Sequence, residues 1–309
     1  MDDAFRHEAL LYAGDEGFVT TVAPFIREGV EAGEPTLVVV GARKIDLLRE
    51  ALGRDAESVR FADMAAVGHN PARIIPAWEE FVLANAAPGV RVRGVGEPIF
   101  PERRADELVE CQRHESLLNL AFADANAFWL VCPYDTEALP PEVIGEALRS
   151  HPVVGRDDVH EESPLYRGLG EIAAPFEAPL SEPPAGAPTL RFGADTLEAV
   201  RHFVVAESGR AGLPEGRRGH LVIATNEIAS NSVEYGGGDG AVSLWAEDGR
   251  VVCEVRDAGR ILDPLADRRR PAADALGGRG LWIANQLCDL VQVRTFREGT
   301  AVRLHMALP

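Results

Sequence analysis

Lysine is almost absent from this sequence of 309 residues, in which Lys44 is the only lysine among 31 basic residues. A phosphate-binding P-loop requires the pattern G-x-x-x-x-G-K-[ST]. Around Lys44 the sequence reads VVVGARKI, which lacks the glycine spacing of that pattern. The sequence therefore excludes a P-loop and most chemistry that depends on a lysine side chain.

Long apolar runs, a secretory leader and clustered cysteines are missing as well. No run approaches the roughly 20 apolar residues of a membrane-spanning helix, and the start, Met-Asp-Asp, lacks the basic and apolar segments of a signal peptide. The cysteines form no C-x-x-C pair, which argues against both a disulfide framework and a zinc cluster. We expect a soluble, cytoplasmic protein with no membrane partner. The four cysteines are Cys111, Cys132, Cys253 and Cys288.

The composition is otherwise that of an ordinary globular protein, with 46% hydrophobic and 26% charged residues. The length allows two domains of roughly 100–200 residues each. The formal net charge of −18 repels nucleic-acid backbones and anionic lipids. We therefore expect no direct nucleic-acid partner.

A proline-rich segment divides the chain. Residues 174–189 read APFEAPLSEPPAGAPT, a composition that resists both helix and sheet. We interpret residues 174–188 as a linker between a first domain, 1–173, and a second domain, 189–309. Residues 1–187 carry a net charge of −17 and residues 188–309 only −1, with 15 arginines. The acidity of the chain therefore does not argue against a phosphate ligand in the second domain.

The first domain alternates short apolar runs with helical stretches, which favours a three-layer α/β domain built on a parallel sheet. A continuous run of mostly β-branched residues, 36–40, is typical of a strand buried on both faces. The expected strands are 9–12, 36–40, 59–62, 90–94 and 128–132, and the expected helices are 15–31, 44–52, 71–85, 102–123 and 141–149.

The second domain groups its helices with strands that pair through short turns, which favours a two-layer α/β sandwich. Asp248-Gly249 marks a hairpin between two of these strands. The expected strands are 190–192, 242–246, 251–257, 291–296 and 301–306, and the expected helices are 196–209, 216–234 and 280–289.

Two motifs of the second domain place polar groups on a helix and at a strand end. In residues 226–231, NEIASN, Glu227 and Asn231 are one turn apart and project together from an otherwise apolar helix. In Asp257-Ala258-Gly259, the aspartate can accept a hydrogen bond from an exocyclic amine, and the glycine lets a flat ring approach the backbone. Each motif alone is more often a solvated helix face or a turn.

Two further motifs follow. Residues 277–281, GGRGL, open a helix and can offer backbone N–H groups to an anion. Gly299-Thr300 enters the last strand, where the hydroxyl could reach a base or a ribose. The four motifs follow one another at intervals of 20 to 26 residues, each at a boundary between elements.

With this series, residues 188–309 resemble the GHKL ATPase fold of gyrase and the histidine kinases, and most closely its branch of anti-sigma-factor serine kinases. The resemblance implies a Bergerat-type two-layer sandwich that binds ATP and Mg²⁺. It implies Glu227 as the carboxylate that orients or deprotonates the attacking hydroxyl, and Asn231 as the Mg²⁺ ligand. Asp257 and Gly259 would contact the adenine, with Thr300 beside it. The phosphate-facing turn would consist of Gly278, Arg279, Gly280 and Leu281.

One position departs from the family pattern. Many members have D-x-G-x-G, whereas Arg260 and Ile261 follow Gly259 here, so the second glycine is missing. Residues 260–276 would form the nucleotide lid. The missing glycine favours an alternative in which bound nucleotide only sets a conformation for partner binding.

The first domain resembles the MEDS sensory domain through several short segments. The resemblance implies a RecA-like layout without a working phosphate loop, and sensing of an unknown small-molecule signal. The segments are HEALLY at 7–12, GEP at 33–35, HESLLN at 114–119, CPYD at 132–135 and HP at 151–152.

A sensor histidine kinase with His114 as phosphoacceptor is the competing hypothesis. Its dimerisation hairpin would need a long second helix, but residues 128–133, FWLVCP, read as a buried strand. We interpret His114 as a helix residue or a sensor-site group. The other histidines form no H-E-x-x-H pattern, and we interpret them as structural or solvent-facing.

Together these features predict a signal-responsive regulator that binds Mg-ATP and phosphorylates a Ser or Thr of an anti-sigma-factor antagonist. Sequestration of a sigma factor is a second expected activity. Related kinase domains imply a homodimer.

Overall fold

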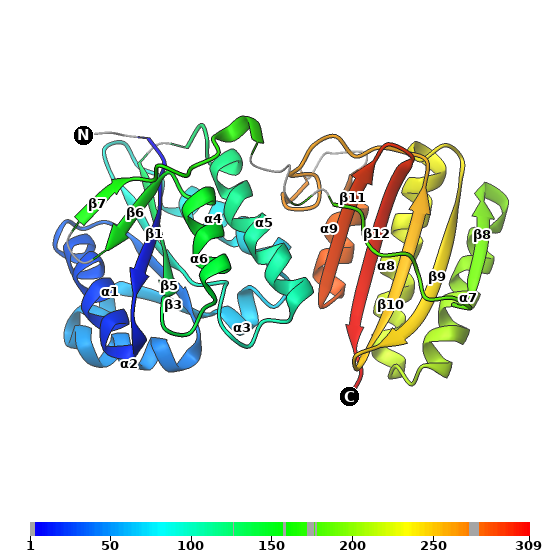
Figure 1. The fold of residues 1–309 in the computed structure, drawn as a ribbon, viewed down its shortest axis with the longest axis horizontal. Coiled ribbons are helices and arrows are strands. Elements are labelled where there is room, and N and C mark those ends of the chain that lie inside the picture. The colour runs from blue at the N-terminus through cyan, green and yellow to red at the C-terminus, as the bar shows by residue number, and fades with distance from the viewer. Residues whose placement is uncertain (1–3, 126, 157–158, 172–175, 177, 272–277) are drawn as a thin grey trace. The chain divides into compact units, whose positions relative to one another are not determined.

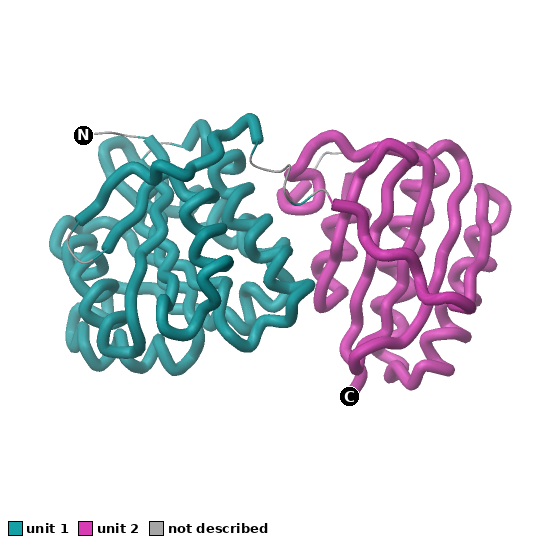
Figure 2. The backbone as a smooth tube through the Cα atoms, viewed as in Figure 1, with its two compact units in different colours: residues 1–176 teal, residues 177–309 magenta. Residues whose placement is uncertain are grey.

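A computed structural model describes residues 4–125, 127–156, 159–171, 176, 178–271 and 278–309. The chain divides into two units, Met1–Phe176 and Glu177–Pro309, shown in teal and magenta in Figure 2. Among the described residues, no helix combines the length and the apolar character needed to cross a membrane.

The described part of the first unit forms a seven-stranded sheet in the order β3-β2-β4-β5-β1-β6-β7 (Figure 1). All neighbouring strands are parallel except β6 and β7, which are antiparallel. The strands are β1 (Arg6–Tyr12), β2 (Thr36–Val40), β3 (Val59–Asp63), β4 (Val92–Gly96), β5 (Phe128–Asp135), β6 (Val153–Arg156) and β7 (Val159–Glu162). The helices are α1 (Gly14–Glu31), α2 (Ala42–Leu52), α3 (Met64–Val67), α4 (Ile74–Asn85), α5 (Ala105–Ala121) and α6 (Pro141–Ser150).

Helices cover both faces of this sheet. On one face, Phe18 and Ile26 of α1 pack with Val38 and Val131 of the strands in a single buried cluster. Side chains alternate along a strand, so the neighbours of these residues point to the opposite face, where α4 lies. The predicted three-layer α/β class is confirmed.

Trp78 of α4 anchors the second face. Its ring is 1% exposed and lies over β4, where a Cβ atom on Gly94 or Gly96 would come within 3.0 Å of the ring. The two glycines therefore make the space that the indole fills. They also explain why the predicted strand, 90–94, ends too early: glycine reads as a turn signal, but here it continues the strand to residue 96.

Replacing Trp78 with alanine is expected to destabilise the first unit by about 3–5 kcal/mol, because the ring leaves a large cavity above glycines that cannot fill it. Urea unfolding followed by far-ultraviolet circular dichroism measures the change. Leu83→Ala on the same helix is the matched control, since Leu83 is 80% exposed and its loss is expected to change stability by less than about 0.5 kcal/mol. Equal effects of the two substitutions would contradict the packing described here.

Strands β6 and β7 have no counterpart among the predicted elements. The residues of β7, Val-His-Glu-Glu, are all exposed at the edge of the sheet. A strand without a buried face has no apolar alternation to reveal it.

The second unit is an antiparallel five-stranded sheet in the order β11-β12-β10-β9-β8, with its helices on one face (Figure 1). The predicted two-layer α/β sandwich is confirmed. The strands are β8 (Thr189–Gly193), β9 (Asp239–Glu247), β10 (Arg250–Asp257), β11 (Leu290–Phe296) and β12 (Gly299–Ala307), and the helices are α7 (Leu197–Arg210), α8 (Glu215–Tyr235) and α9 (Arg279–Leu287). At the β9–β10 turn, Asp248 and Gly249 have φ angles of 48° and 75°, as a tight hairpin of right-handed twist requires.

The end of the proline-rich segment belongs to the second unit. Residues 178–188 cross the sheet face opposite the helices (Figure 1). There the Arg303 guanidinium donates to the Ser181 carbonyl oxygen, and Arg256 forms an ion pair with Glu182 at 2.8 Å. This part of the segment is thus fixed to β10 and β12.

Candidate functional site

Helix α8 supplies one wall of the site in the second unit. Its apolar positions, including Leu221, Ala224 and Ile228, are buried against the sheet. Glu227 and Asn231, which the sequence places one turn apart, are half-buried beside the start of α9. The pair therefore does not lie on a fully solvated helix face.

Asp257 ends β10 with both carboxylate oxygens held. Oδ2 accepts a hydrogen bond from the Ser232 hydroxyl at 2.6 Å, and Oδ1 accepts one from the Gly259 amide N–H at 2.8 Å. Two fixed donors define the orientation of the carboxylate, whose side chain lines a cavity. Ser232 is a site residue that sequence reasoning missed, although it directly follows Asn231 on α8.

The Thr300 hydroxyl and the backbones of Gly236 and Gly259 lie around Asp257. The register of β10 and β12 places Asp257 opposite Thr300, 43 residues later in the chain. The Thr300 hydroxyl donates to the Gly259 carbonyl oxygen at 2.9 Å. A Cβ atom on Gly259 would come within 2.7 Å of the Gly236 Cα atom, so the close approach of these two backbones requires glycine. Gly236 was also missed, and the run of three glycines after α8 was the available signal.

The N-terminus of α9 forms the opposite end. Gly278 caps the helix with a φ of 80°, a left-handed conformation that suits glycine. A Cβ atom on Gly280 would stand 2.6 Å from the Asn231 Nδ2 atom and 3.3 Å from the Glu227 Cβ atom. Gly280 thus lets the first turn of α9 approach the polar pair of α8.

A cavity of about 210 Å³ brings these groups together. Six of the nine residues named from the sequence line it: Asn231, Asp257, Gly259, Gly278, Leu281 and Thr300. Gly280 lies behind Asn231, and Arg279 begins α9. Glu227 is next to Gly280 and outside the lining.

The remaining lining residues include Tyr235, Ile261 and Ala266. Ile261, which stands where the family pattern has its second glycine, places an apolar side chain at the cavity and donates its amide N–H to the Thr295 hydroxyl at 3.3 Å. Gly277 and residues 272–276 of the expected lid lie outside the described residues.

The donor set fits a magnesium nucleotide. An asparagine amide oxygen is a hard ligand of the kind that Mg²⁺ accepts. Gly278 and Leu281 place the first turn of α9 at the wall of the cavity. The N-terminus of a helix favours phosphate.

Lys44, the single lysine, lies in the first unit. Its ammonium group is 2.5 Å from the Glu97 Oε1 atom and donates to the Tyr12 hydroxyl. Burial raises the pKa of the Glu97 carboxyl, and the Lys44 charge opposes that rise. Lys44 thus forms a largely buried ion pair with Glu97.

The second unit is a two-layer α/β sandwich with a cavity lined by residues of α8, the start of α9 and the sheet. Comparison with protein families gives the same class: residues 191–306 match the histidine kinase-like ATPase domain. Residues 6–152 match MEDS, the methanogen/methylotroph, DcmR sensory domain. The two family matches agree with the resemblances that the sequence predicts, MEDS in the first part of the chain and a histidine kinase-like ATPase domain in the second.

No curated protein matches the chain. Among solved structures, it is similar to the RsbU and RsbW domains of Rv1364c from Mycobacterium tuberculosis, with 21% identity and a TM-score of 0.30. The match covers 39% of this chain and 32% of that one. The chain thus spans about a third of that protein's length, and a similarity this low carries no argument about function.

Proposed function

We propose that the second domain binds Mg-ATP in the cavity between α8, α9 and the end of β10, and transfers the γ-phosphoryl group to a Ser or Thr of an anti-sigma-factor antagonist. The observation that carries this proposal is the convergence of Asn231, Asp257, Gly278 and Thr300, from separate elements, on one cavity. We further propose that residues 1–173 receive a signal that regulates the transfer.

The adenine end of the site is the Asp257 end. Its carboxylate is oriented by Ser232 and Gly259 and retains lone pairs that can accept from an exocyclic amine. Thr300 holds the Gly259 carbonyl group in place. Ile228 and Val302 supply apolar lining on which a flat ring can pack.

The phosphate end is the start of α9. The N–H groups after Gly278 offer hydrogen bonds to phosphate oxygens, and the helix dipole favours negative charge there. Asn231 supplies an oxygen ligand for Mg²⁺, and Glu227 is the carboxylate that orients or deprotonates the hydroxyl of the partner protein. Bound ATP supplies the phosphoryl group, and the protein contributes positioning and charge neutralisation.

A nucleotide-dependent protein-binding switch without phosphoryl transfer is the second candidate function. The observation that favours it is Ile261, whose side chain fills space at the cavity where the family pattern has a glycine. The histidine-kinase alternative gains no support, because His114 is only 1% exposed within α5.

Incubation with γ-labelled ATP, Mg²⁺ and proteins captured by the immobilised chain distinguishes these functions. Label on a captured protein, at Ser or Thr, is the outcome expected for the kinase. Tight ATP binding with no transferred label would favour the switch. Acid-labile label on the chain itself, lost in His114→Ala, would instead favour the histidine kinase.

A further inference from the structure

A second group of polar side chains lies fully buried in the first unit. His7 of β1, Glu115 of α5, Cys132 of β5 and His151 after α6 each present one ligand-type atom, and these four atoms lie within 4.8 Å of one another. Each of the four residues is at most 1% exposed. The sequence predicts structural or solvent-facing positions for these histidines, whereas the fold brings two of them together with a carboxylate and a thiol.

The orientation of the His7 ring follows from Asn119. The Asn119 amide group donates to the carbonyl oxygens of Ser150 at 2.8 Å and Ser116 at 3.2 Å, so its Oδ1 atom faces His7 as an acceptor. The His7 Nδ1 atom, 3.1 Å away, is therefore the N–H donor of the neutral ring. Its Nε2 atom then carries a bare lone pair.

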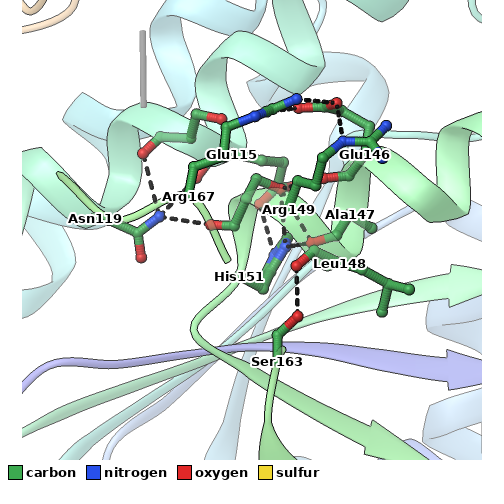
Figure 3. A network of polar contacts seen from close by, with 11 residues as sticks. Glu115, Asn119, Glu146, Ala147, Leu148, Arg149, His151, Ser163 and Arg167 are labelled. Carbon is green, nitrogen blue, oxygen red and sulfur yellow. Dashed lines mark hydrogen bonds and ion pairs between the residues drawn. The ribbon is translucent and has the colours of Figure 1, made fainter. Parts of the chain in front are cut away.

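The His151 ring is oriented in the same sense. Its Nδ1 atom is 2.8 Å from the Ala147 carbonyl oxygen, which can only accept (Figure 3). Nδ1 is thus a donor, which leaves Nε2 as the ring nitrogen that can bind a metal ion. A backbone carbonyl or an amide oxygen that fixes the second ring nitrogen is the arrangement found around metal-bound histidines.

Both Nε2 atoms face the same carboxylate oxygen. The Glu115 Oε2 atom is 3.2 Å from His7 Nε2 and 3.3 Å from His151 Nε2, and the Cys132 Sγ atom is 3.4 Å from His7 Nε2. Two imidazole nitrogens and a carboxylate oxygen that face one another are stable together when a cation, either a proton or a metal ion, lies among them. Ligand atoms bound to one tetrahedral zinc ion, at about 2.0–2.3 Å from the metal, are separated by roughly 3.3–3.6 Å. The three separations named here are close to these, and all four ligand atoms lie within 4.8 Å of one another.

We propose that His7, Glu115, Cys132 and His151 bind one Zn²⁺ ion in a four-coordinate site inside the first unit. Thiolate, imidazole and carboxylate are the three ligand types that zinc takes in proteins, and four protein ligands close a structural site. On binding, the Cys132 thiol loses its proton to solvent, and the resulting thiolate and the Glu115 carboxylate together balance the charge of the ion.

The site connects the parts of the first unit. Its ligands come from two adjacent strands, β1 and β5, from α5, and from the residue that follows α6. A cavity of about 530 Å³, lined by His7, Asn119 and Phe128 among others, borders the cluster at His7. Zinc therefore stabilises the packing of both helices on the sheet.

A nucleophilic cysteine is the competing explanation. The Cys132 thiol contacts the His7 ring, and the His7 ring contacts the Asn119 amide, which is the arrangement of the catalytic Cys-His-Asn groups of thiol hydrolases. That role requires an open approach for a substrate, whereas Cys132 is 1% exposed. The arrangement also leaves His151 and Glu115 without a role, whereas a metal ion uses all four side chains.

Metal analysis of the full-length chain tests the proposal. We expect one equivalent of Zn²⁺ per chain, and after removal by a chelator a lower melting temperature that added Zn²⁺ restores. Replacement by Co²⁺ should give the strong visible absorption of a tetrahedral ion and a near-ultraviolet thiolate-to-cobalt band. These readouts do not depend on ATP or on phosphoryl transfer, so their failure leaves the proposed kinase function untouched.

Variants assign the ligands. Cys132→Ser should abolish the thiolate-to-cobalt band, whereas Cys111→Ser, which removes another fully buried thiol of the same unit, should retain it. Asn119→Ala should weaken zinc binding by roughly 10–100-fold, because it frees the His7 ring without removing a ligand.

Uptake of well under one equivalent of metal by the wild-type chain would overturn the proposal. So would a thiolate-to-cobalt band that persists in Cys132→Ser. Rapid stoichiometric alkylation of Cys132 by iodoacetamide in the presence of zinc would favour the nucleophilic thiol instead.

Discussion

Asp257→Asn is expected to weaken ATP binding by roughly 100-fold or more, about 3 kcal/mol. The carboxylate accepts from Ser232 on one oxygen and from the Gly259 N–H on the other. An asparagine offers one oxygen and one NH₂ group, so one of these donors faces another donor. The substitution also removes the charge that strengthens a hydrogen bond from the adenine amine. Titration with a fluorescent ATP analogue measures the loss.

Asp248→Asn is the matched control, because it makes the same chemical change in an exposed turn at the opposite end of β10. Asparagine also tolerates the positive φ angle of residue 248. The control should bind the ATP analogue as the wild type does. If Asp257→Asn retained wild-type affinity and its melting temperature, the adenine would not be bound at this end of the cavity.

The second unit could be predicted largely from its sequence because its turns carry clear signals and the buried positions of its main helix recur at helical spacing. The apolar residues of α8 recur at helical spacing, and the Asp-Gly turn fixes the hairpin of β9 and β10. The pairing of Asp257 with Thr300 could not be read from periodicity, since it depends on the register between two strands that are distant in sequence. The family resemblance, and not the spacing of the residues, placed Asp257 and Thr300 in one site.

The contacts around Asp257 show what a motif omits. Ser232 and Gly236 were not identified, because a hydroxyl in a helix and a glycine after it have common structural explanations. Only the folded chain shows that the hydroxyl donates to Asp257 and that the glycine lies against Gly259.

The cluster in the first unit was missed for a topological reason. Metal sites are recognised in sequences by ligands a few residues apart, whereas positions 7, 115, 132 and 151 share no short spacing. The parallel pairing of β1 with β5 places Ala9 opposite Cys132, so His7 is two residues from the thiol across the strand pair. That neighbourhood follows from the strand order, which the sequence did not reveal.

Glu227→Gln is expected to reduce phosphoryl transfer by roughly 10²–10⁴-fold while ATP binding changes little. Glutamine keeps the size of the side chain beside Gly280, so the first turn of α9 can remain in place. It cannot take a proton or present a charged acceptor to the attacking hydroxyl. The substituted side chain lies outside the cavity lining, which is why affinity should survive. Label transfer to the captured partner and titration with the ATP analogue are measured on the same preparation.

Glu234→Gln serves as the control, since Glu234 is exposed near the end of the same helix. It should transfer label at the wild-type rate. Asn231→Ala should behave differently from Glu227→Gln and Glu234→Gln. Because it removes the proposed Mg²⁺ ligand, Mg²⁺ should no longer strengthen ATP binding, and label transfer should fall as well. Wild-type transfer by Glu227→Gln would show that the partner hydroxyl needs no base from α8. Equal ATP binding by all variants without transfer, even by the wild type, would leave the nucleotide-dependent switch as the function of this cavity.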